Sequence, residues 1–158
     1  ELQFVYIFLI PIIGLMLVAF ITNVFAKEAK GHGVPEVMSA VTRKGGIIRL
    51  RIVLVKMFVS AITIGSGGSV GREGPIVHIG SAIGSVFGQY FKLSSSAVTV
   101  LVGCGAAAGI SATFNAPIAG TLFASEVILR DIRITSVSPI LISSLVAASC
   151  VSLPIGQL

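Results

Sequence analysis

One acidic side chain, Glu73, lies in a glycine-rich stretch that separates two long apolar segments. The stretch runs from Gly65 to Pro75 and reads GSGGSVGREGP. Proline is favoured in the first position of a helix, because the N–H group that it lacks would be unpaired there. We therefore expect a helix to begin at Pro75. The unpaired N–H groups of a helix start attract anions, so Glu73 is predicted to lie at the mouth of an anion site. This arrangement suits a gate better than a catalyst.

A second stretch of the same kind lies earlier in the chain. Gly31-His32-Gly33-Val34-Pro35 again places glycines before a proline, and Glu36 follows in the first turn of the expected helix. The helix dipole favours an acidic residue at that position. Non-helical backbone inside a membrane is tolerated only where protein buries it or where it lines a watery cavity. Two such helix starts that converge can hold an anion through backbone amides, tightly enough to select it and weakly enough to release it.

The composition excludes an ordinary soluble protein. Of the 158 residues, 54% are hydrophobic and 11% are charged, whereas charged residues make up about 25% of soluble domains. The mean hydropathy is +1.03. A helix crosses a bilayer with roughly 20 apolar residues. Segments without Lys, Arg, Asp or Glu that reach about this length are Leu2–Ala26, Gly74–Phe91, Leu93–Ser125 and Ile134–Leu158. We predict an all-α, polytopic membrane protein.

The net charge of +5 does not indicate nucleic-acid binding in such a chain. Basic residues cluster in the connecting stretches 27–30 and 43–51, as the positive-inside rule predicts for cytoplasmic loops. The first apolar segment has neither a basic start nor a small-residue cleavage site, so we do not expect it to be a signal peptide. Cys104 and Cys150 lie in apolar segments and are interpreted as free core thiols.

Glycine, proline and charge predict where the helices begin and end. Asn115-Ala116-Pro117 is expected to divide the segment 93–125, because proline disfavours a helical residue before it. Glu126–Arg133 is expected to be a charged connector. Gly80, Gly84 and Gly88 recur every four residues and predict a ridge for close helix contact. The other expected helices are Leu2–Phe25, Pro35 to about Val41, Arg49–Ile64, Pro75–Tyr90 and Ile134–Leu158.

Four stretches of the chain resemble the CLC family of chloride channels and proton-coupled chloride antiporters. Residues 71–75 match the family signature G-[KR]-E-G-P in full, and residues 31–35 match the signature G-S-G-I-P except at two positions. Residues 105–109 (GAAAG) and 114–120 (FNAPIAG) also look like the family's sequence downstream of its gate. Order and spacing agree along nearly the whole chain, so the resemblance does not rest on one pentapeptide.

The resemblance implies a role for each of the matching residues. Glu73 is implied to be the gating glutamate, whose carboxylate occupies an anion site and swings away when it is protonated or displaced. The amides of Arg72, Glu73 and Gly74 are implied to line the outer chloride site. The inner and central chloride sites are implied to be lined by Gly31, His32, Gly33 and Val34. Chloride is then the transported ion, and no cofactor or metal is implied.

The resemblance also implies a larger assembly. The family's subunit contains two inverted repeats around one pore, and two subunits form a homodimer in which each keeps its own pore. We interpret residues 1–158 as much of the N-terminal repeat, with the second half of the subunit missing. Residues from Pro117 onward are implied to supply part of the dimer contact. We expect a multi-pass protein of the cell membrane.

Two positions depart from the family pattern. The serine of the first signature, whose hydroxyl contacts chloride in the family, is His32 here, so selectivity or pH response is expected to differ. The inner proton-relay glutamate of the antiporters aligns with Val127, just after Glu126. Valine there resembles the channel branch, although some exchangers of the family also lack this acid.

Other interpretations remain beside these. Glu73 could be a structural acid paired with Arg72, although adjacent residues on a helix do not face each other. His78 is interpreted as a hydrogen-bonded residue of a helix interface. Glu126 is interpreted as structural at a helix end rather than as a proton carrier. His32 either bonds to backbone or lines the pathway.

Two transport functions and one enzymatic function compete. A voltage-gated-type chloride channel gated by Glu73 is the first hypothesis, and a chloride–proton antiporter that uses Glu126 or a water path is the alternative. An intramembrane serine protease built on Ser66 or Ser69 with His78 lacks the G-x-S-G elbow that it would need. A nucleotide-binding loop lacks the required Lys-Ser/Thr after its glycines. We therefore do not expect an enzyme.

Overall fold

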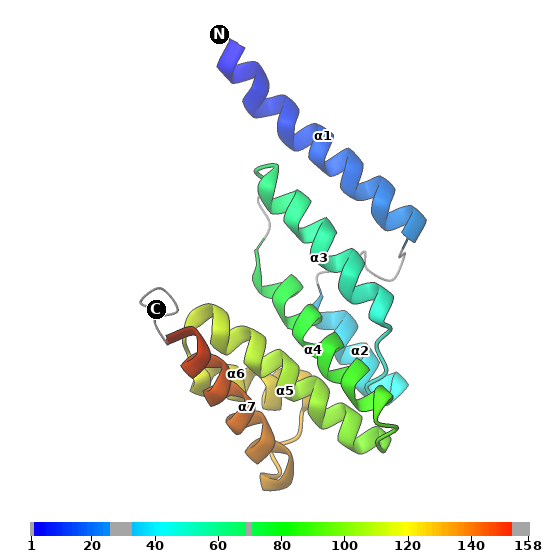
Figure 1. Cartoon of the computed structure of the whole chain (residues 1–158), viewed down its shortest axis with the longest axis vertical. Helices are drawn as coiled ribbons and strands as arrows, with labels where there is room; N and C mark the ends of the chain where they lie inside the picture. The colour runs from blue at the N-terminus through cyan, green and yellow to red at the C-terminus, as the bar shows by residue number, and fades with distance from the viewer. Residues whose placement is uncertain (1, 26–32, 69–70, 153–158) are drawn as a thin grey trace.

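The structure is a computed structural model that describes residues 2–25, 33–68 and 71–152, and every element in that part of the chain is helical (Figure 1). This confirms the predicted all-α class. The helices are α1 (Leu2–Phe25), α2 (Val34–Lys44), α3 (Leu50–Gly65), α4 (Glu73–Tyr90), α5 (Ser95–Phe114), α6 (Pro117–Phe123), η2 (Ala124–Leu129) and α7 (Ile134–Ser152).

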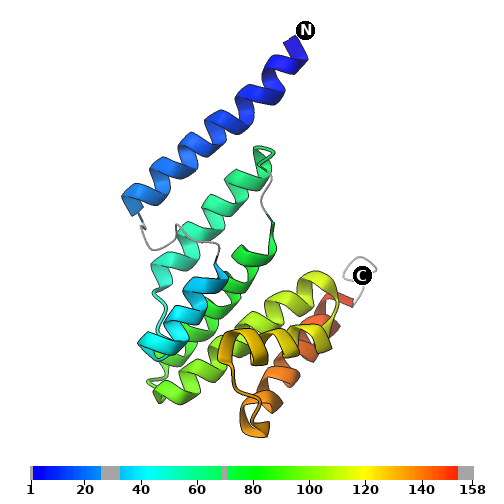
Figure 2. The ribbon, with the colours of Figure 1, turned by 180° about the vertical axis from the view of Figure 1, so that it is seen from behind.

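The helices form a bundle from which α1 projects. α4 packs against α5, and α5 packs against α7 and α6. α3 lies on α4, and α1 contacts α3 at the edge of the assembly, as the front and back views show (Figures 1 and 2). α2 is short and lies between α4 and η2. The two glycine loops therefore lead into helices that are held inside the bundle.

Glycine allows α4 and α5 to approach each other at the backbone. A Cβ atom at Gly80 would overlap the carbonyl group of Gly105, and one at Gly84 would overlap the carbonyl group of Leu101. Gly88 faces the side chain of Val98 in the same seam. The predicted glycine ridge is confirmed as a packing surface.

The segment after α5 is divided where the sequence predicted. Asn115 adopts a left-handed conformation with φ of 51°, and Pro117 is the first residue of α6. The expectation of a connector over Glu126–Arg133 is wrong in its first half. Residues 124–129 form a π-helical turn that continues α6, and only residues 130–133 link it to α7. The neighbours of Glu126 explain this, because the apolar residues Ala124 and Ile128 and the polar residue Ser125 are buried.

Two described helices are long and apolar enough to cross a membrane, namely α5 and α7, and both were expected. The shorter apolar helices are Leu9–Val24, Val53–Gly65 and Pro117–Leu129. The expected span 74–91 does not meet the same criterion within the described residues, because α4 carries glycine, serine and His78 among its apolar residues.

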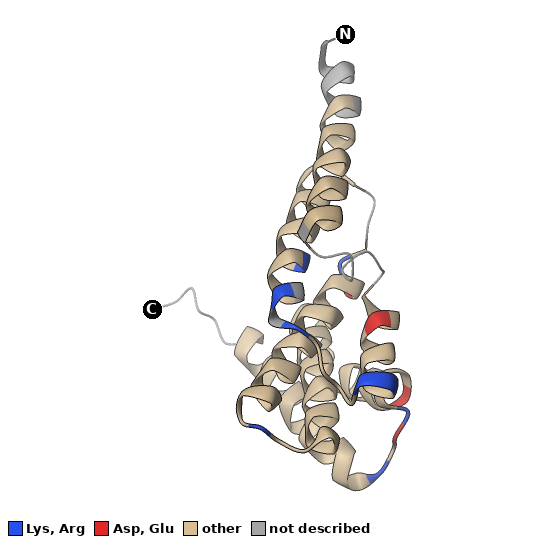
Figure 3. Cartoon of the chain, turned by 90° about the vertical axis from the view of Figure 1, so that its right-hand side faces the viewer, with Lys and Arg blue, Asp and Glu red and all other residues tan. Residues whose placement is uncertain are grey.

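Charge and exposure fit a bilayer environment. The described part of α1 and the whole of α7 carry no charged side chain. The Lys and Arg residues lie mainly on the links, at the end of α2 and in the first half of α3 (Figure 3). Large apolar side chains such as Phe20, Phe58 and Ile142 are exposed over more than half of their surface. Single apolar residues on a surface are ordinary, but whole apolar helix faces of this kind mark contact with protein or lipid.

Candidate functional site

The starts of α2 and α4 lie against each other. Gly33, the residue before α2, is buried and has φ of 96°, a conformation that favours glycine. A Cβ atom at Gly33 would overlap the carbonyl group of Gly74 and would lie 3.3 Å from the Cβ atom of His78. The first turns of two helices from the two glycine loops therefore meet at one place.

The start of α4 leaves backbone amides uncapped. The helix begins at Glu73, two residues before the predicted Pro75, because the carbonyl of Arg72 already accepts a hydrogen bond from the N–H of Ile76 at 3.1 Å. No side chain among the described residues caps this end. The amides of Glu73 and Gly74 lie in the first turn, where an α-helix offers them no acceptor. Pro75 has no N–H to satisfy.

The side chains of Arg72 and Glu73 point to different surroundings. The guanidinium carbon of Arg72 lies 5.7 Å from the ring centre of Phe114, a cation–π contact that joins the start of α4 to the end of α5. The carboxylate of Glu73 is exposed and folds back over Gly71. In the part of the chain that the structure describes, the two side chains form no ion pair with each other. The structure therefore does not contain the Glu73–Arg72 pairing that was considered as a structural alternative.

The start of α2 is capped by its own acid. The N–H group of Gly33 donates a hydrogen bond to Oε2 of Glu36 at 2.7 Å. The carboxylate expected in the first turn is present and occupies the amide that the resemblance assigned to chloride. Val34 is half-buried at the first position of the helix. Gly31 and His32 lie outside the described residues.

The predicted inner end of the pathway contains one exposed acid and one valine. Glu126 and Val127 lie in η2, which packs against α2 and α5. The carboxylate of Glu126 is exposed and makes no hydrogen bond to the described residues. Glu126 therefore has no bond at a helix end within the described chain, and its role as a structural acid rather than a proton carrier stays a prediction.

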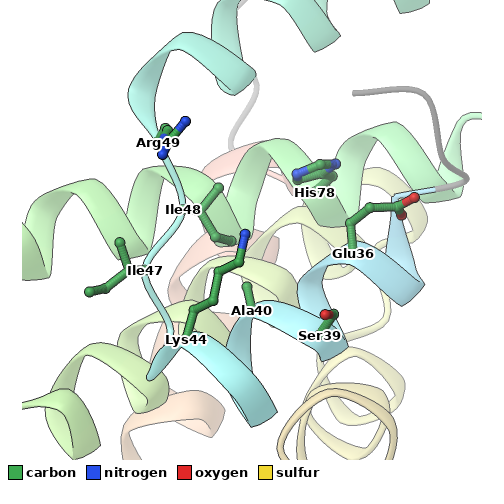
Figure 4. A pocket seen from close by; sticks show the side chains of 8 residues that line it. All are labelled: Glu36, Ser39, Ala40, Lys44, Ile47, Ile48, Arg49 and His78. Carbon is green, nitrogen blue, oxygen red and sulfur yellow. The ribbon is translucent and has the colours of Figure 1, made fainter. Parts of the chain in front are cut away.

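Sequence reasoning missed a polar cluster beside the helix starts. His78 is only 2% exposed, and its Nδ1 atom has no hydrogen-bond partner among the described residues, so the interpretation of His78 as a satisfied interface residue is wrong. His78 and Glu36 both line a cavity between α2 and α4 (Figure 4). The available signal was that ionisable residues inside apolar segments are functional candidates by default. The sequence does not tell which of them meet.

A salt bridge orders the link between η2 and α7. The Arg133 guanidinium lies 2.8 Å from the Asp131 carboxylate and, through its hydrogen bonds, holds the pKa of that carboxyl well below its usual range. Asp131 also accepts hydrogen bonds from the N–H of Arg133 and from the hydroxyl of Ser136. This link lies outside the membrane-spanning helices.

These observations define a class before any comparison is made: a helical membrane protein in which two helix starts, each preceded by a glycine loop, are brought together. The profile of one family, the voltage gated chloride channels, matches residues 14–157. The match covers most of the chain, so the chain belongs to this family, the CLC family. The resemblance noted from the loop signatures is thereby confirmed.

The relatives include proteins with two kinds of name. A ClcB-like chloride channel protein of Ralstonia nicotianae is 34% identical over 88% of the chain and 33% of its own length. The H(+)/Cl(-) exchange transporter ClcA of Vibrio cholerae is 37% identical over 81% of the chain and 28% of its own length. The chain thus spans about a third of the length of these relatives.

The fold is also that of a solved family member. A crystal structure of a slow cyanobacterial Cl-/H+ antiporter superimposes with a TM-score of 0.77 and 26% identity, over 96% of this chain and 37% of the other. The tilted, interrupted helices seen here are therefore the CLC arrangement.

Proposed function

We propose that this chain supplies much of the N-terminal repeat of a CLC-type transporter that exchanges chloride for protons across a membrane. The support comes from the family membership, from the relative named as an exchange transporter and from the antiporter structure of the same fold. These relatives favour coupled exchange over the passive channel that the sequence first suggested. In this proposal the chain belongs to the first of two inverted repeats. One repeat cannot enclose a pathway alone, so a second repeat completes the transporter.

The observation that carries the proposal is the contact between Gly33 and Gly74. It brings the start of α4, which no described side chain caps, next to the start of α2. Partial positive charge from helix starts attracts a halide without the cost of releasing it from a full ion pair. Glu73, in the first turn of α4, is an anion tethered beside that place.

The proposed roles follow from this competition. The Glu73 carboxylate acts as the gate and occupies the anion position until a proton or a chloride ion displaces it. The amides of Arg72, Glu73 and Gly74 hold chloride on the outer side. The loop that contains Gly31, His32, Gly33 and Val34 holds it on the inner side, with Gly33 shared between chloride and the Glu36 carboxylate.

The proposed protein is a homodimer in the cell membrane. The faces of α6 and α7 that point out of the bundle are apolar, with Ile118, Leu122 and Ile142 exposed. Residues from Pro117 onward then contribute part of the contact between subunits. A second subunit or lipid covers the remainder of these faces.

A passive chloride channel is the second candidate. The observation that favours it is Val127, which stands where the antiporters carry their inner relay acid and which cannot take up a proton. The relative from Ralstonia nicotianae is named as a chloride channel protein. In this candidate Glu73 gates chloride flow, and protons only shift the gate.

Reversal potentials separate the two candidates. The full-length protein is reconstituted into planar bilayers under opposed chloride and pH gradients. We expect a reversal potential that lies between the chloride and proton values. A potential set by chloride alone would contradict exchange and leave the channel. If gel filtration shows a folded protein but no chloride current is measured, anion transport is contradicted.

A further inference from the structure

His78 is a buried histidine with an unused nitrogen. Its side chain is 2% exposed. Two buried side-chain atoms in the described chain lack a hydrogen-bond partner, Nδ1 of His78 and Oγ of Ser81, and both belong to α4. Buried polar atoms are nearly always hydrogen-bonded to protein or to water. The Nδ1 atom lacks such a bond and is closed to solvent in this structure, so water can bond to it only after a neighbouring side chain shifts.

The space for that water is present. His78 lines a cavity of about 470 Å³ between α2, α4 and the α2–α3 link, together with Glu36, Ser39, Lys44 and Arg49 (Figure 4). One water molecule takes up about 30 Å³ in the liquid. The cavity has room for several waters in a row and has polar groups along its wall.

One end of the cavity lies at the basic links. Lys44 and Arg49 line this part of the cavity and belong to the basic stretch 43–51. Three links gather at this end of the bundle, because Gly45, Ser95 and Arg133 line one further cavity of about 590 Å³. Basic links on one side of a membrane protein are cytoplasmic by the positive-inside rule. The His78 cavity therefore opens toward the cytoplasmic side.

Another part of the cavity wall is Glu36, which lies in the first turn of α2. Glu36 binds the N–H of Gly33 at 2.7 Å, and Gly33 lies against both Gly74 and the Cβ atom of His78. Figure 4 shows the Glu36 carboxylate on α2 and the His78 ring on the adjacent helix α4, on the same side of the cavity. The two protonatable groups thus lie between the cytoplasmic opening and the start of α4.

The charges around His78 come from two of its neighbouring helices and from the link. Lys56 of α3 and Glu36 of α2 act on the ring with opposite sign. Lys44 at the end of α2 and Arg49 on the link add positive charge at the opening. α5, which covers the other face of α4, has no charged side chain. A neutral imidazole in this setting keeps one N–H donor and one free acceptor.

We propose that His78 and Glu36 form the inward proton path of this transporter and replace the acid that is absent at position 127. A proton from cavity water binds the free ring nitrogen of His78, and the proton on the other nitrogen leaves to water or to the Glu36 carboxylate. One proton enters and one leaves, so the ring ends neutral. A proton on Glu36 weakens its hold on the N–H of Gly33, which is then available to chloride. The inference rests on the proposed exchange function.

The test uses the full-length protein in liposomes, with proton and chloride transport measured together. In His78→Gln the side chain keeps a polar group but can neither gain nor lose a proton near neutral pH. In Glu36→Gln the amide oxygen can still accept from Gly33. We expect either change to lower proton transport by on the order of 100-fold, as for removal of a positioned proton-transfer group, while chloride transport continues. The reversal potential then moves to the chloride value.

A matched control is Glu126→Gln, which removes the exposed acid of η2. It should keep the wild-type ratio of protons to chloride. Normal coupling in His78→Gln, or loss of coupling in Glu126→Gln alone, would overturn the proposed path and leave exchange intact. Equal loss of proton and chloride transport in both His78→Gln and Glu36→Gln would assign the pair a structural role and overturn the path. Absence of coupling in the wild-type protein would overturn exchange itself.

Discussion

The backbone of Gly33 lies directly against the carbonyl group of Gly74, so that position 33 has no room for a side chain at this contact. The contact connects residues 41 positions apart and determines where the first turns of α2 and α4 meet.

The contact predicts a large effect of one methyl group. Gly33→Ala would place Cβ against Gly74 and force alanine to adopt φ of 96°. The backbone conformation alone costs about 1–3 kcal/mol. We expect a lower unfolding temperature in detergent and loss of chloride transport. Gly65→Ala is the control, because a Cβ at Gly65 meets nothing within 4 Å. Equal stability of the two variants would contradict the contact.

The proposed role of Glu73 as a gate predicts a change in pH dependence. Glu73→Gln resembles the protonated acid and removes the tethered negative charge from the start of α4. We expect anion transport that no longer varies with pH, measured as chloride efflux from liposomes over a series of acidic to neutral pH values. Arg72→Gln should keep the pH dependence, since Arg72 contacts Phe114 instead of Glu73. A Glu73→Gln profile that follows the wild type would argue against the gate.

The α2–α3 link is predicted to depend on one buried hydroxyl. Ser85 donates to the carbonyl of Gly46 at 2.5 Å and accepts from the N–H of Ile48 at 2.8 Å. Ser85→Ala leaves both backbone groups unpaired, which costs about 1–3 kcal/mol for each buried group. Chemical denaturation should show a lower free energy of unfolding. Ser149→Ala, an exposed serine bonded within its own helix, should have almost no effect. Similar losses for both serines would contradict this role of Ser85.

The η2–α7 link is predicted to weaken in acid. The hydrogen bonds from Arg133 keep the pKa of the Asp131 carboxyl below its value in the unfolded chain, so the native state favours the ionised form. The stabilisation is complete above the unfolded pKa of about 3.9 and is lost progressively as pH falls below it. Hydrogen exchange at residues 133–137 should be slower in the wild type than in Asp131→Asn near neutral pH, and the difference should narrow below about pH 4. A difference that grows on acidification would contradict this sign.

Local signals in the sequence predicted the helices well. Proline and asparagine at 115–117 marked the end of α5, and glycines every four residues marked its seam with α4, because turn chemistry and small-residue spacing act within a few residues. The start of α4 was placed two residues late. Pro75 is tolerated within the first turn, since no residue there has an intrahelical acceptor for its N–H.

The missed features are all contacts between distant residues. Glu126 was expected in a connector, but its apolar neighbours are buried by α2 and α5 and keep that segment helical. His78, Lys56 and Glu36 appeared in the sequence as single polar residues in three segments. Their convergence depends on how α2, α3 and α4 cross, which no short-range pattern contains. The meeting of Gly33 with Gly74 is likewise a property of the bundle.

The seam between α4 and α5 has a consequence for how such a protein can move. At Gly80 and Gly105 the two backbones touch without intervening side chains, so no rotamer there can change to let one helix slide along the other. We therefore expect the two helices to move as one rigid body. The motion that this packing allows is that of single side chains at the end of the helix pair.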